Sequence, residues 1–244
     1  MTAADHWERE ALNWSAFVRG PARDAYEDYA PSFFELLPES PKQLLEVGCG
    51  EGRVSRDLRS RGYDPVGVDI SPTLVRLAQQ ADPDGRYVVA DAASLPFDDD
   101  GFGLVVAYNS LMDVDDLTRA VSEIARVLEP GGRLCVCVTH PFADAGRFST
   151  READAAFVVT DSYLERRPFE LTVERNGVRM TFGGWAYPLE AYGRAFEDAG
   201  LLVEALREPA VPDKALERDP AEGRWKRMPA FLFIRAIKRG SGAL

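Results

Sequence analysis

Short apolar runs alternate with amphipathic stretches between residues 43 and 139. The runs predict strands at 44–47, 66–69, 87–91, 102–107 and about 133–139, and the stretches between them predict helices near 53–61, 72–81 and 115–128. Ser71 before Pro72 is typical of a helix N-cap followed by proline at the first helical position. Parallel strands joined by helices predict an α/β, doubly wound sheet with the ligand-facing loops at one edge.

The flanking segments follow different patterns. Residues 1–42 form an aromatic-rich helical pattern that is broken at Gly20-Pro21, with Pro31 and Pro38 as further candidate helix ends. Residues 142–187 interrupt the alternation, and two alternating runs around Asn176-Gly177 predict a β-hairpin. A helix at 189–199 and strands at 201–206 and 230–237 complete the predicted sheet.

Composition and charge narrow the class of protein. A chain of 244 residues with 45% hydrophobic and 28% charged residues is typical of one globular domain. Apolar runs stay well below the ~20 residues of a membrane helix, and the amino terminus lacks a secretion-signal pattern, so we expect a cytoplasmic protein. The net charge of −11 weighs against a nucleic-acid partner, and the only dense basic cluster is 224–227.

Cysteine and histidine usage argues against disulfides and metals. Cys135 and Cys137 lie two apart on a predicted strand, so they share one face with poor disulfide geometry. His6 and His140 are far apart, and no Cys/His spacing fits zinc. We expect small buried cysteines and no metal site.

The most informative motif is the glycine loop after the first strand. Gly48, Gly50 and Gly52 follow an apolar run and open a helix, an arrangement that lets backbone amides approach a ligand. A dinucleotide motif would place its third glycine at Arg53, although the acid about 20 residues further on is present as Asp69. The acid just before the loop, Glu46, suits a cationic ligand better than a diphosphate.

Elements further along the chain help to decide which class of cofactor the glycine loop binds. The third strand ends at Asp91, Leu95-Pro96-Phe97 follows, and a Pro-Gly-Gly turn at 130–132 leads into the fifth strand. This set resembles the class I S-adenosylmethionine-dependent methyltransferases, in the small-molecule, type 11-like branch, from about Gln43 to Thr139 and more weakly to Lys238. The resemblance implies a seven-stranded Rossmann-like sheet of order 3-2-1-4-5-7-6 with strand 7 antiparallel, and S-adenosylmethionine as cofactor.

The resemblance also implies roles for individual residues. Gly48 and Gly50 would let the backbone approach the methionyl part of the cofactor, Glu46 would reach its ammonium, and Asp69 would accept the ribose hydroxyls. Ile70 would lie against the adenine, which Asp91 and the Ala92 amide would hydrogen-bond. The remaining predicted cofactor-binding residues are Trp14, Tyr26, Cys49, Arg53, Leu74, Tyr108 and Asn109. The alternative interpretation makes Asp69 and Asp91 helix caps or turn acids.

The acceptor is expected beside the residues after strand four, which include Ser110, Leu111 and Asp113. Nucleic-acid amine methyltransferases carry Asn/Asp-Pro-Pro-aromatic there, whereas this chain has Asn109-Ser110-Leu111-Met112, which argues against base methylation. If the acceptor must lose a proton, His140 is the candidate catalytic base; bracing of a strand end is its alternative role. Aromatic residues that could line an acceptor pocket, or simply pack, are Phe142, Phe148, Tyr163, Trp185, Tyr187 and Trp225.

The expected organisation is a single domain with four parts: a helical segment at 1–42 that packs on the sheet or acts as a lid, a cofactor-binding core at 43–141, an insertion at 142–187 that caps the site or forms an oligomer contact, and the rest of the sheet at 188–244. The expected function is methyl transfer from S-adenosylmethionine to oxygen or nitrogen of a small molecule, by a monomer or homodimer. The alternative is a methyltransferase-fold protein that binds the cofactor but catalyses another reaction, such as cyclisation. A nicotinamide-dependent enzyme is disfavoured by Arg53 and the Pro-Gly-Gly turn.

Overall fold

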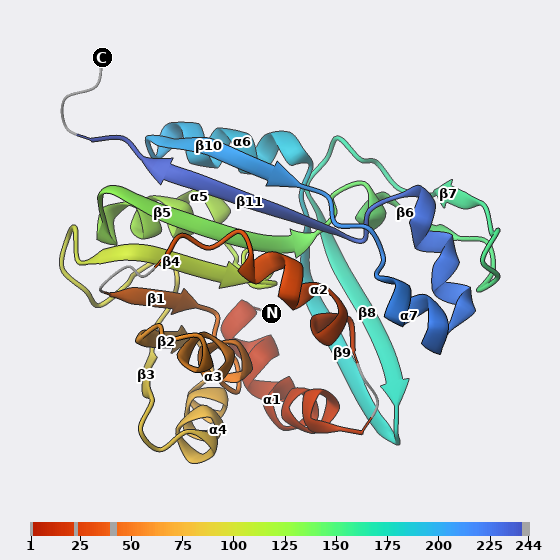
Figure 1. Ribbon diagram of the computed structural model, residues 1–244, viewed down its shortest axis with the longest axis horizontal. Coiled ribbons are helices and arrows are strands. Elements are labelled where there is room, and N and C mark those ends of the chain that lie inside the picture. The colour runs from red at the N-terminus through yellow and green to blue at the C-terminus, as the bar shows by residue number, and fades with distance from the viewer. Residues whose placement is uncertain (1, 22–23, 40–42, 241–244) are drawn as a thin grey trace.

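A seven-stranded sheet forms the centre of the molecule (Figure 1), in a computed structural model that describes residues 2–21, 24–39 and 43–240. Its order is β10-β11-β5-β4-β1-β2-β3, with β11 antiparallel to both of its neighbours and the other pairs parallel. The strands are β1 (Leu44–Val47), β2 (Pro65–Asp69), β3 (Arg86–Val89), β4 (Phe102–Tyr108), β5 (Leu128–Thr139), β10 (Leu201–Arg207) and β11 (Phe231–Lys238). The predicted order and the antiparallel last strand are confirmed.

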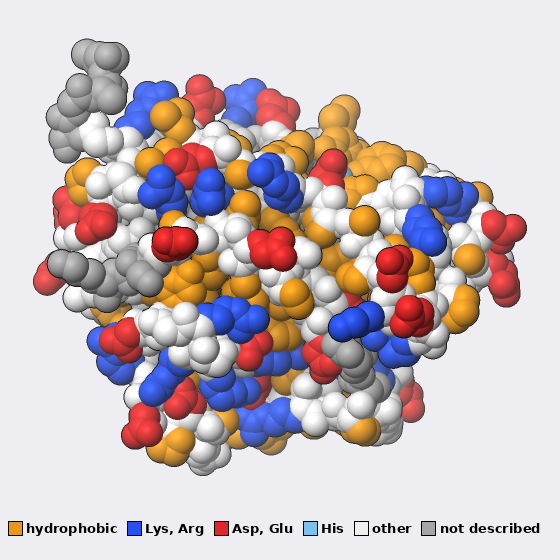
Figure 2. Space-filling model, viewed as in Figure 1, with side chains coloured by type: hydrophobic (Ala, Val, Ile, Leu, Met, Phe, Trp, Pro, Cys, Tyr) orange, Lys and Arg blue, Asp and Glu red, His pale blue; other side chains and the backbone are white. Residues whose placement is uncertain are grey.

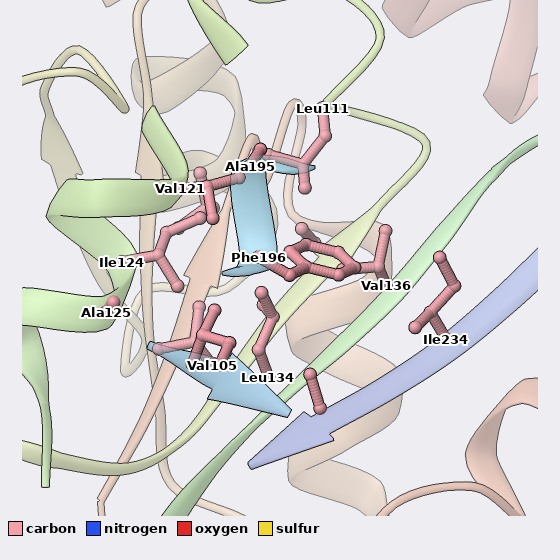
Figure 3. Close-up of a cluster of buried hydrophobic side chains, with 14 of the residues drawn as sticks. Val105, Leu111, Val121, Ile124, Ala125, Leu134, Val136, Ala195, Phe196 and Ile234 are labelled. Carbon is pink, nitrogen blue, oxygen red and sulfur yellow. The ribbon is translucent and has the colours of Figure 1, made fainter. Parts of the chain in front are cut away.

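Helices cover both faces of this sheet because alternate strand residues point to opposite sides. On one face, Val105, Leu134 and Val136 pack with residues of α5 (Leu117–Val127) and α6 (Leu189–Asp198), as Figure 3 shows. On the other face, the intervening strand residues pack against α2 (Ala25–Phe34) and α3 (Arg53–Ser60). Cys135 and Cys137 are free and buried together on this second face, as their spacing predicted.

Local signals fix most helix ends. The Ser71 hydroxyl accepts a hydrogen bond from the Leu74 amide at 3.1 Å and caps α4 (Pro72–Ala81). The first helix, α1 (Ala3–Arg19), ends before Gly20 as expected. The expected helix end at Pro31 was wrong, whereas α2 ends at Phe34 and the turns that follow it stop before Pro38. Pro31 lies inside α2, which reaches Phe34 because its buried aromatic face outweighs the lost backbone hydrogen bond. The predicted boundary at residue 42 lies outside the described residues.

The predicted hairpin is present as β8 (Arg167–Arg175) and β9 (Val178–Ala186). Asn176 and Gly177 both have positive φ, 54° and 74°, which is the conformation of a two-residue turn that matches the strand twist. Helix α1 packs between β9 and α4, so the hairpin and the amino-terminal helix meet at the same end of the sheet (Figure 1).

Some short elements were not predicted, since three to eight residues carry little periodicity. They are η1 (Ala143–Ala145), β6 (Gly146–Phe148), β7 (Phe157–Val159), α7 (Asp213–Arg218) and η2 (Pro220–Arg227). The basic cluster 224–227 falls in η2, where Arg224 pairs with Glu222 at 3.0 Å. Within the described part of the chain, no helix is long and apolar enough to cross a membrane.

Candidate active site

A cavity of about 610 Å³ opens at the carboxyl ends of β1, β2 and β4. Its walls come from the glycine loop, helix α1, the β8–β9 hairpin and the loop after β4. All the residues predicted to bind the cofactor line this cavity: Trp14, Tyr26, Glu46, Gly48, Cys49, Gly50, Arg53, Asp69, Ile70, Leu74, Asp91, Ala92, Tyr108 and Asn109. His140 does not line it.

Two glycines of the loop are needed for close packing. Gly48 has φ of 75°, and a Cβ there would lie 2.3 Å from the Cβ of Ser110 in the loop after β4. Gly50 has φ of 55°, and a Cβ there would lie 3.1 Å from the indole nitrogen of Trp14. The loop can therefore touch both the β4 loop and α1 only without side chains at these positions.

The backbone amides of this loop are already used within the protein. The Gly48 and Cys49 amides both donate to the Val68 carbonyl, at 2.8 and 2.9 Å. The Gly50 amide donates to the Asp69 carboxylate at 2.8 Å. A phosphate-binding loop would aim these amides at its ligand, whereas these three donate within the protein. Carbonyls and carboxylates remain, and they suit a cationic ligand.

Asp69 has the turn-acid role that was the alternative interpretation, and it also lines the cavity. Its Oδ2 accepts from the Gly50 amide and its Oδ1 accepts from the Ser71 amide at 2.9 Å, so the carboxylate organises the turn around β2. Each carboxylate oxygen also keeps a further lone pair. Burial raises its pKa to about 6, although the two amide hydrogen bonds act in the opposite direction.

The other two acids differ in environment. Glu46 is buried and accepts from the Ser55 hydroxyl, and burial raises its pKa to about 8. Asp91 is exposed at the end of β3, where its carboxylate accepts from the Ala93 amide at 2.8 Å. Glu46 thus lies at the inner end of the cavity and Asp91 at its outer end.

Polar contacts to α4 on one side and to β9 on the other hold helix α1 over the cavity. Glu8 accepts from the Ser71 and Thr73 hydroxyls at 2.5 and 2.6 Å and from the Thr73 amide at 3.1 Å, which joins α1 to the start of α4. His6 Nε2 lies 3.0 Å from the Thr181 carbonyl of β9. The aromatic side of α1, including Trp14, faces the cavity.

Tyr26 and Arg53 form a second wall between α2 and α3. The Tyr26 hydroxyl donates to Asp57 at 2.6 Å, and the Arg53 guanidinium lies over the Tyr26 ring at 4.1 Å. Arg53 also pairs with Asp24 at 2.7 Å. The residue that departs from the dinucleotide motif therefore ties the amino-terminal segment to the first helix of the core.

The hairpin supplies an apolar wall that was not identified residue by residue from the sequence. Phe169, Leu171 and Val173 alternate along β8 and line the cavity with Phe182 and Trp185 of β9. The alternation in β8 was the available signal, since residues two apart on a strand share a face. Of the six aromatic candidates for an acceptor pocket, only Trp185 lines the cavity. Phe142, Phe148 and Tyr163 pack within the insertion, Trp225 of η2 packs on Phe148, and Tyr187 packs on Tyr192.

His140 is held at the end of β5, away from the cavity. Its Nε2 lies 2.9 Å from a Glu208 carboxylate oxygen, and its Nδ1 accepts from the Phe142 amide at 3.1 Å. Burial lowers its pKa, against the raising effect of Glu208. This geometry is that of a histidine bracing a strand end, and its role as a base remains a prediction from sequence.

The strand order, the glycine loop and the acids after β2 and β3 together define a Rossmann-like fold of the class I S-adenosylmethionine-dependent methyltransferases. Comparison with known proteins agrees with this class. Residues 45–136 match the family model described as a methyltransferase domain.

Similar proteins include an uncharacterized methyltransferase of Mycobacterium tuberculosis, 36% identical over 120 residues, which are 47% of this chain and 49% of that protein. The chain thus spans about half the length of the first curated relatives it matches. A solved S-adenosylmethionine-dependent methyltransferase from Mesorhizobium loti superposes with a TM-score of 0.70 at 23% identity, covering 86% of this chain and 98% of the other. The [4+2]-cyclase SpnF shares the fold, with a TM-score of 0.63 at 19% identity, covering 98% and 97%.

Proposed function

We propose that this protein transfers a methyl group from S-adenosylmethionine to the oxygen or nitrogen of a small-molecule acceptor. The observation that carries the proposal is the convergence of the whole predicted cofactor set on one cavity whose loop amides are internally bonded. A cavity of about 610 Å³ falls within the range of ~300–1,000 Å³ that small-molecule sites occupy.

The residues of this cavity fit the proposed cofactor. The Tyr108 hydroxyl and Asp24 Oδ1 are buried beside the cavity with no hydrogen-bond partner among the described residues, so a ligand there could satisfy them. In this proposal Asp69 accepts from the ribose hydroxyls, Asp91 and Ala92 hold the adenine, and Glu46 faces the ammonium group.

The bound cofactor supplies an electrophilic methyl group on a sulfonium. The protein's contribution is to hold the acceptor in line with that group, since good alignment alone is worth up to ~7–11 kcal/mol. Helix α1 and the hairpin exclude water, which would otherwise solvate the nucleophile. Asp69, with a pKa of about 6, is mainly ionised at neutral pH and keeps negative charge beside the cofactor, whereas Glu46, with a pKa of about 8, is mainly protonated until a cationic group of the cofactor approaches it.

Calorimetry against S-adenosylhomocysteine and NAD tests the binding step, and label transfer from methyl-labelled cofactor to a panel of metabolites tests the reaction. We expect micromolar or tighter binding of S-adenosylhomocysteine and none of NAD. Binding of NAD alone would refute the proposal. Binding of S-adenosylhomocysteine without label transfer to any acceptor would favour a non-methylating reaction such as cyclisation.

A further inference from the structure

The described residues around the cavity include many more acidic than basic side chains. The acidic lining residues are Asp24, Glu46, Glu51, Asp69, Asp91, Asp113, Asp115, Asp116 and Asp144, and the basic ones are Arg53 and Arg175. Bringing so many carboxylates together is unfavourable unless each finds a donor or a cation.

Most of these carboxylates do find a donor within the protein. Besides Asp24, Glu46, Asp69 and Asp91, whose partners are given above, Glu51 pairs with Arg19 and Arg56. Asp115 accepts from the Ala3 amide, Asp116 from the Arg119 amide and Asp144 from the Thr139 hydroxyl, at 3.0, 3.0 and 2.9 Å.

Asp113 is the exception, because no described residue donates to its carboxylate. It lies in the loop after β4, held there by its amide, which donates to the Ser110 carbonyl at 3.0 Å. One carboxylate oxygen is close to the hairpin backbone: a Cβ on Gly184 would lie 2.7 Å from it. Desolvation raises the pKa of Asp113 well above its usual value, and the nearby Asp69 and Asp144 add to the effect.

The two basic side chains that line the cavity already have partners within the protein. Arg53 is bound to Asp24 and Tyr26, as described above. The Arg175 guanidinium lies 3.8 Å from the centre of the Phe17 ring and donates to the Phe17 carbonyl at 2.8 Å. The hairpin side of the same cavity is instead aromatic and aliphatic, formed by Trp185, Phe182 and the inward side chains of β8.

Resting on the proposed function, we propose that the acceptor is an amine on an apolar body, with its nitrogen bound to Asp113 and its body against the hairpin wall. A carboxylate without a partner, in a cavity rich in acids and lined by apolar side chains, selects a ligand with a positive or hydrogen-bond-donating head and a hydrophobic remainder. An alcohol can donate one hydrogen bond there, and a carboxylic acid would be repelled.

The corresponding transfer is an N-methylation. The bound ammonium group first gives one proton to the Asp113 carboxylate, which releases it to solvent, so that the amine becomes neutral. Its lone pair then forms the new N–C bond, the C–S bond breaks, and the electron pair of that bond stays on sulfur, which becomes a neutral thioether. The positive charge moves to the methylated nitrogen, and one N–H proton passes to the Asp113 carboxylate and then to solvent.

The test uses the full chain loaded with S-adenosylhomocysteine and matched probes: 2-phenylethylamine, tryptamine and hexylamine, each against its alcohol, with 3-phenylpropionate as the acidic probe. We expect at least one amine to bind about tenfold or more tightly than its alcohol, as a charged hydrogen bond would give. Asp113→Asn should abolish this preference, whereas Asp98→Asn, which removes the same charge from an exposed position, should keep it.

Several results would overturn the inference. They are equal affinity for amines and alcohols, a preference for the acid, no binding of any amine, or a preference that survives in Asp113→Asn. A large loss of S-adenosylhomocysteine affinity in Asp113→Asn would assign this carboxyl to the cofactor instead. If Asp113→Asn fails to fold, Asp113→Ser and the wild-type preference keep the test decisive. Failure of the wild type to bind S-adenosylhomocysteine refutes the proposed function itself and is seen before any amine is added.

Discussion

Replacement of Asp69 by asparagine separates the two roles of this residue. The carboxylate accepts from two buried amides, those of Gly50 and Ser71, at 2.8 and 2.9 Å. Asparagine is almost the same size but keeps only one acceptor oxygen, and its NH₂ group must then face an N–H. The substitution therefore breaks one of the two hydrogen bonds without leaving a cavity.

The expected change in the free energy of unfolding is the difference between the loss of one hydrogen bond and the removal of the cost of burying a charge. Loss of one hydrogen bond to a charged group costs roughly 1.5–3 kcal/mol. Because burial raises the pKa of Asp69 from 3.8 to about 6, its ionisation opposes folding at neutral pH by roughly 3 kcal/mol, and asparagine removes this opposition. We expect the free energy of unfolding at pH 7.5 to change by no more than about 2 kcal/mol.

The pH dependence follows from the direction of the pKa shift. The native state takes up the Asp69 proton near pH 6 and the unfolded state only near pH 4, so this group stabilises the wild type as the pH falls through that window. Asp69→Asn lacks this contribution. The free-energy difference between wild type and variant should therefore move in favour of the wild type between pH 7 and pH 4.5, as measured by urea unfolding.

Cofactor affinity should respond differently from stability. If Asp69 accepts from the ribose hydroxyls, loss of charged hydrogen bonds worth roughly 1.5–3 kcal/mol weakens S-adenosylhomocysteine binding by about 10- to 150-fold. Asp64→Asn, which removes an exposed partner of Arg86, is the matched control and should bind normally. A folded Asp69→Asn protein with wild-type affinity for S-adenosylhomocysteine would refute the cofactor role of Asp69. A loss of unfolding free energy well above about 4 kcal/mol would show that removal of the buried charge does not offset the lost hydrogen bond.

Three further predictions test other parts of the site. Gly48→Ala should lower the free energy of unfolding by about 2–4 kcal/mol and abolish cofactor binding, because the added Cβ meets the β4 loop at 2.3 Å. The control Gly62→Ala, at φ of 88° in open space, should lower it by only about 1 kcal/mol. Equal losses for the two variants in urea unfolding would contradict this prediction. His140→Gln should leave turnover with an identified acceptor within about twofold of wild type, since the ring lies outside the cavity; a drop beyond about 100-fold with a changed pH–rate profile would instead identify it as the base. Glu8→Gln should speed the release of S-adenosylhomocysteine severalfold in stopped-flow tryptophan fluorescence, because it weakens the hydrogen bonds between α1 and Thr73. An unchanged rate would show that these hydrogen bonds do not control access to the cavity.

Local chemistry explains why so much of the fold could be predicted. The cap at Ser71, the Asn176-Gly177 turn and the glycines after β1 each have a conformation that few other residues adopt, so the sequence there predicts structure directly. The antiparallel insertion of β11 between β5 and β10 is not local, and it came from the resemblance to methyltransferases alone. Pro31 led to a wrong prediction because proline indicates a helix end from local sequence alone, whereas α2 continues past it through the tertiary packing of its buried aromatic face.

The cofactor half of the cavity was easier to predict than the acceptor half. Its residues follow strand ends, and parallel strands place their carboxyl ends at one edge of a sheet. The acceptor half depends on where the hairpin folds back, which no strand-end rule determines. Phe169 and Phe182 were therefore missed, and Phe148 and Trp225 were considered although they pack elsewhere.

The glycine loop shows how a motif can be identified correctly while its interpretation changes. Three glycines after a strand suggest amides aimed at an anion, but here the amides of Gly48, Cys49 and Gly50 point back into the protein. The acceptor for the third amide is Asp69, the same acid that would mark a ribose site in a dinucleotide fold. Because that carboxylate lies on the loop, these three amides are not available to neutralise a diphosphate, and the charge of Asp69 itself would repel one. In the proposed function, selection of a cationic cofactor over a dinucleotide therefore depends on where three N–H groups point, rather than on the spacing of the glycines.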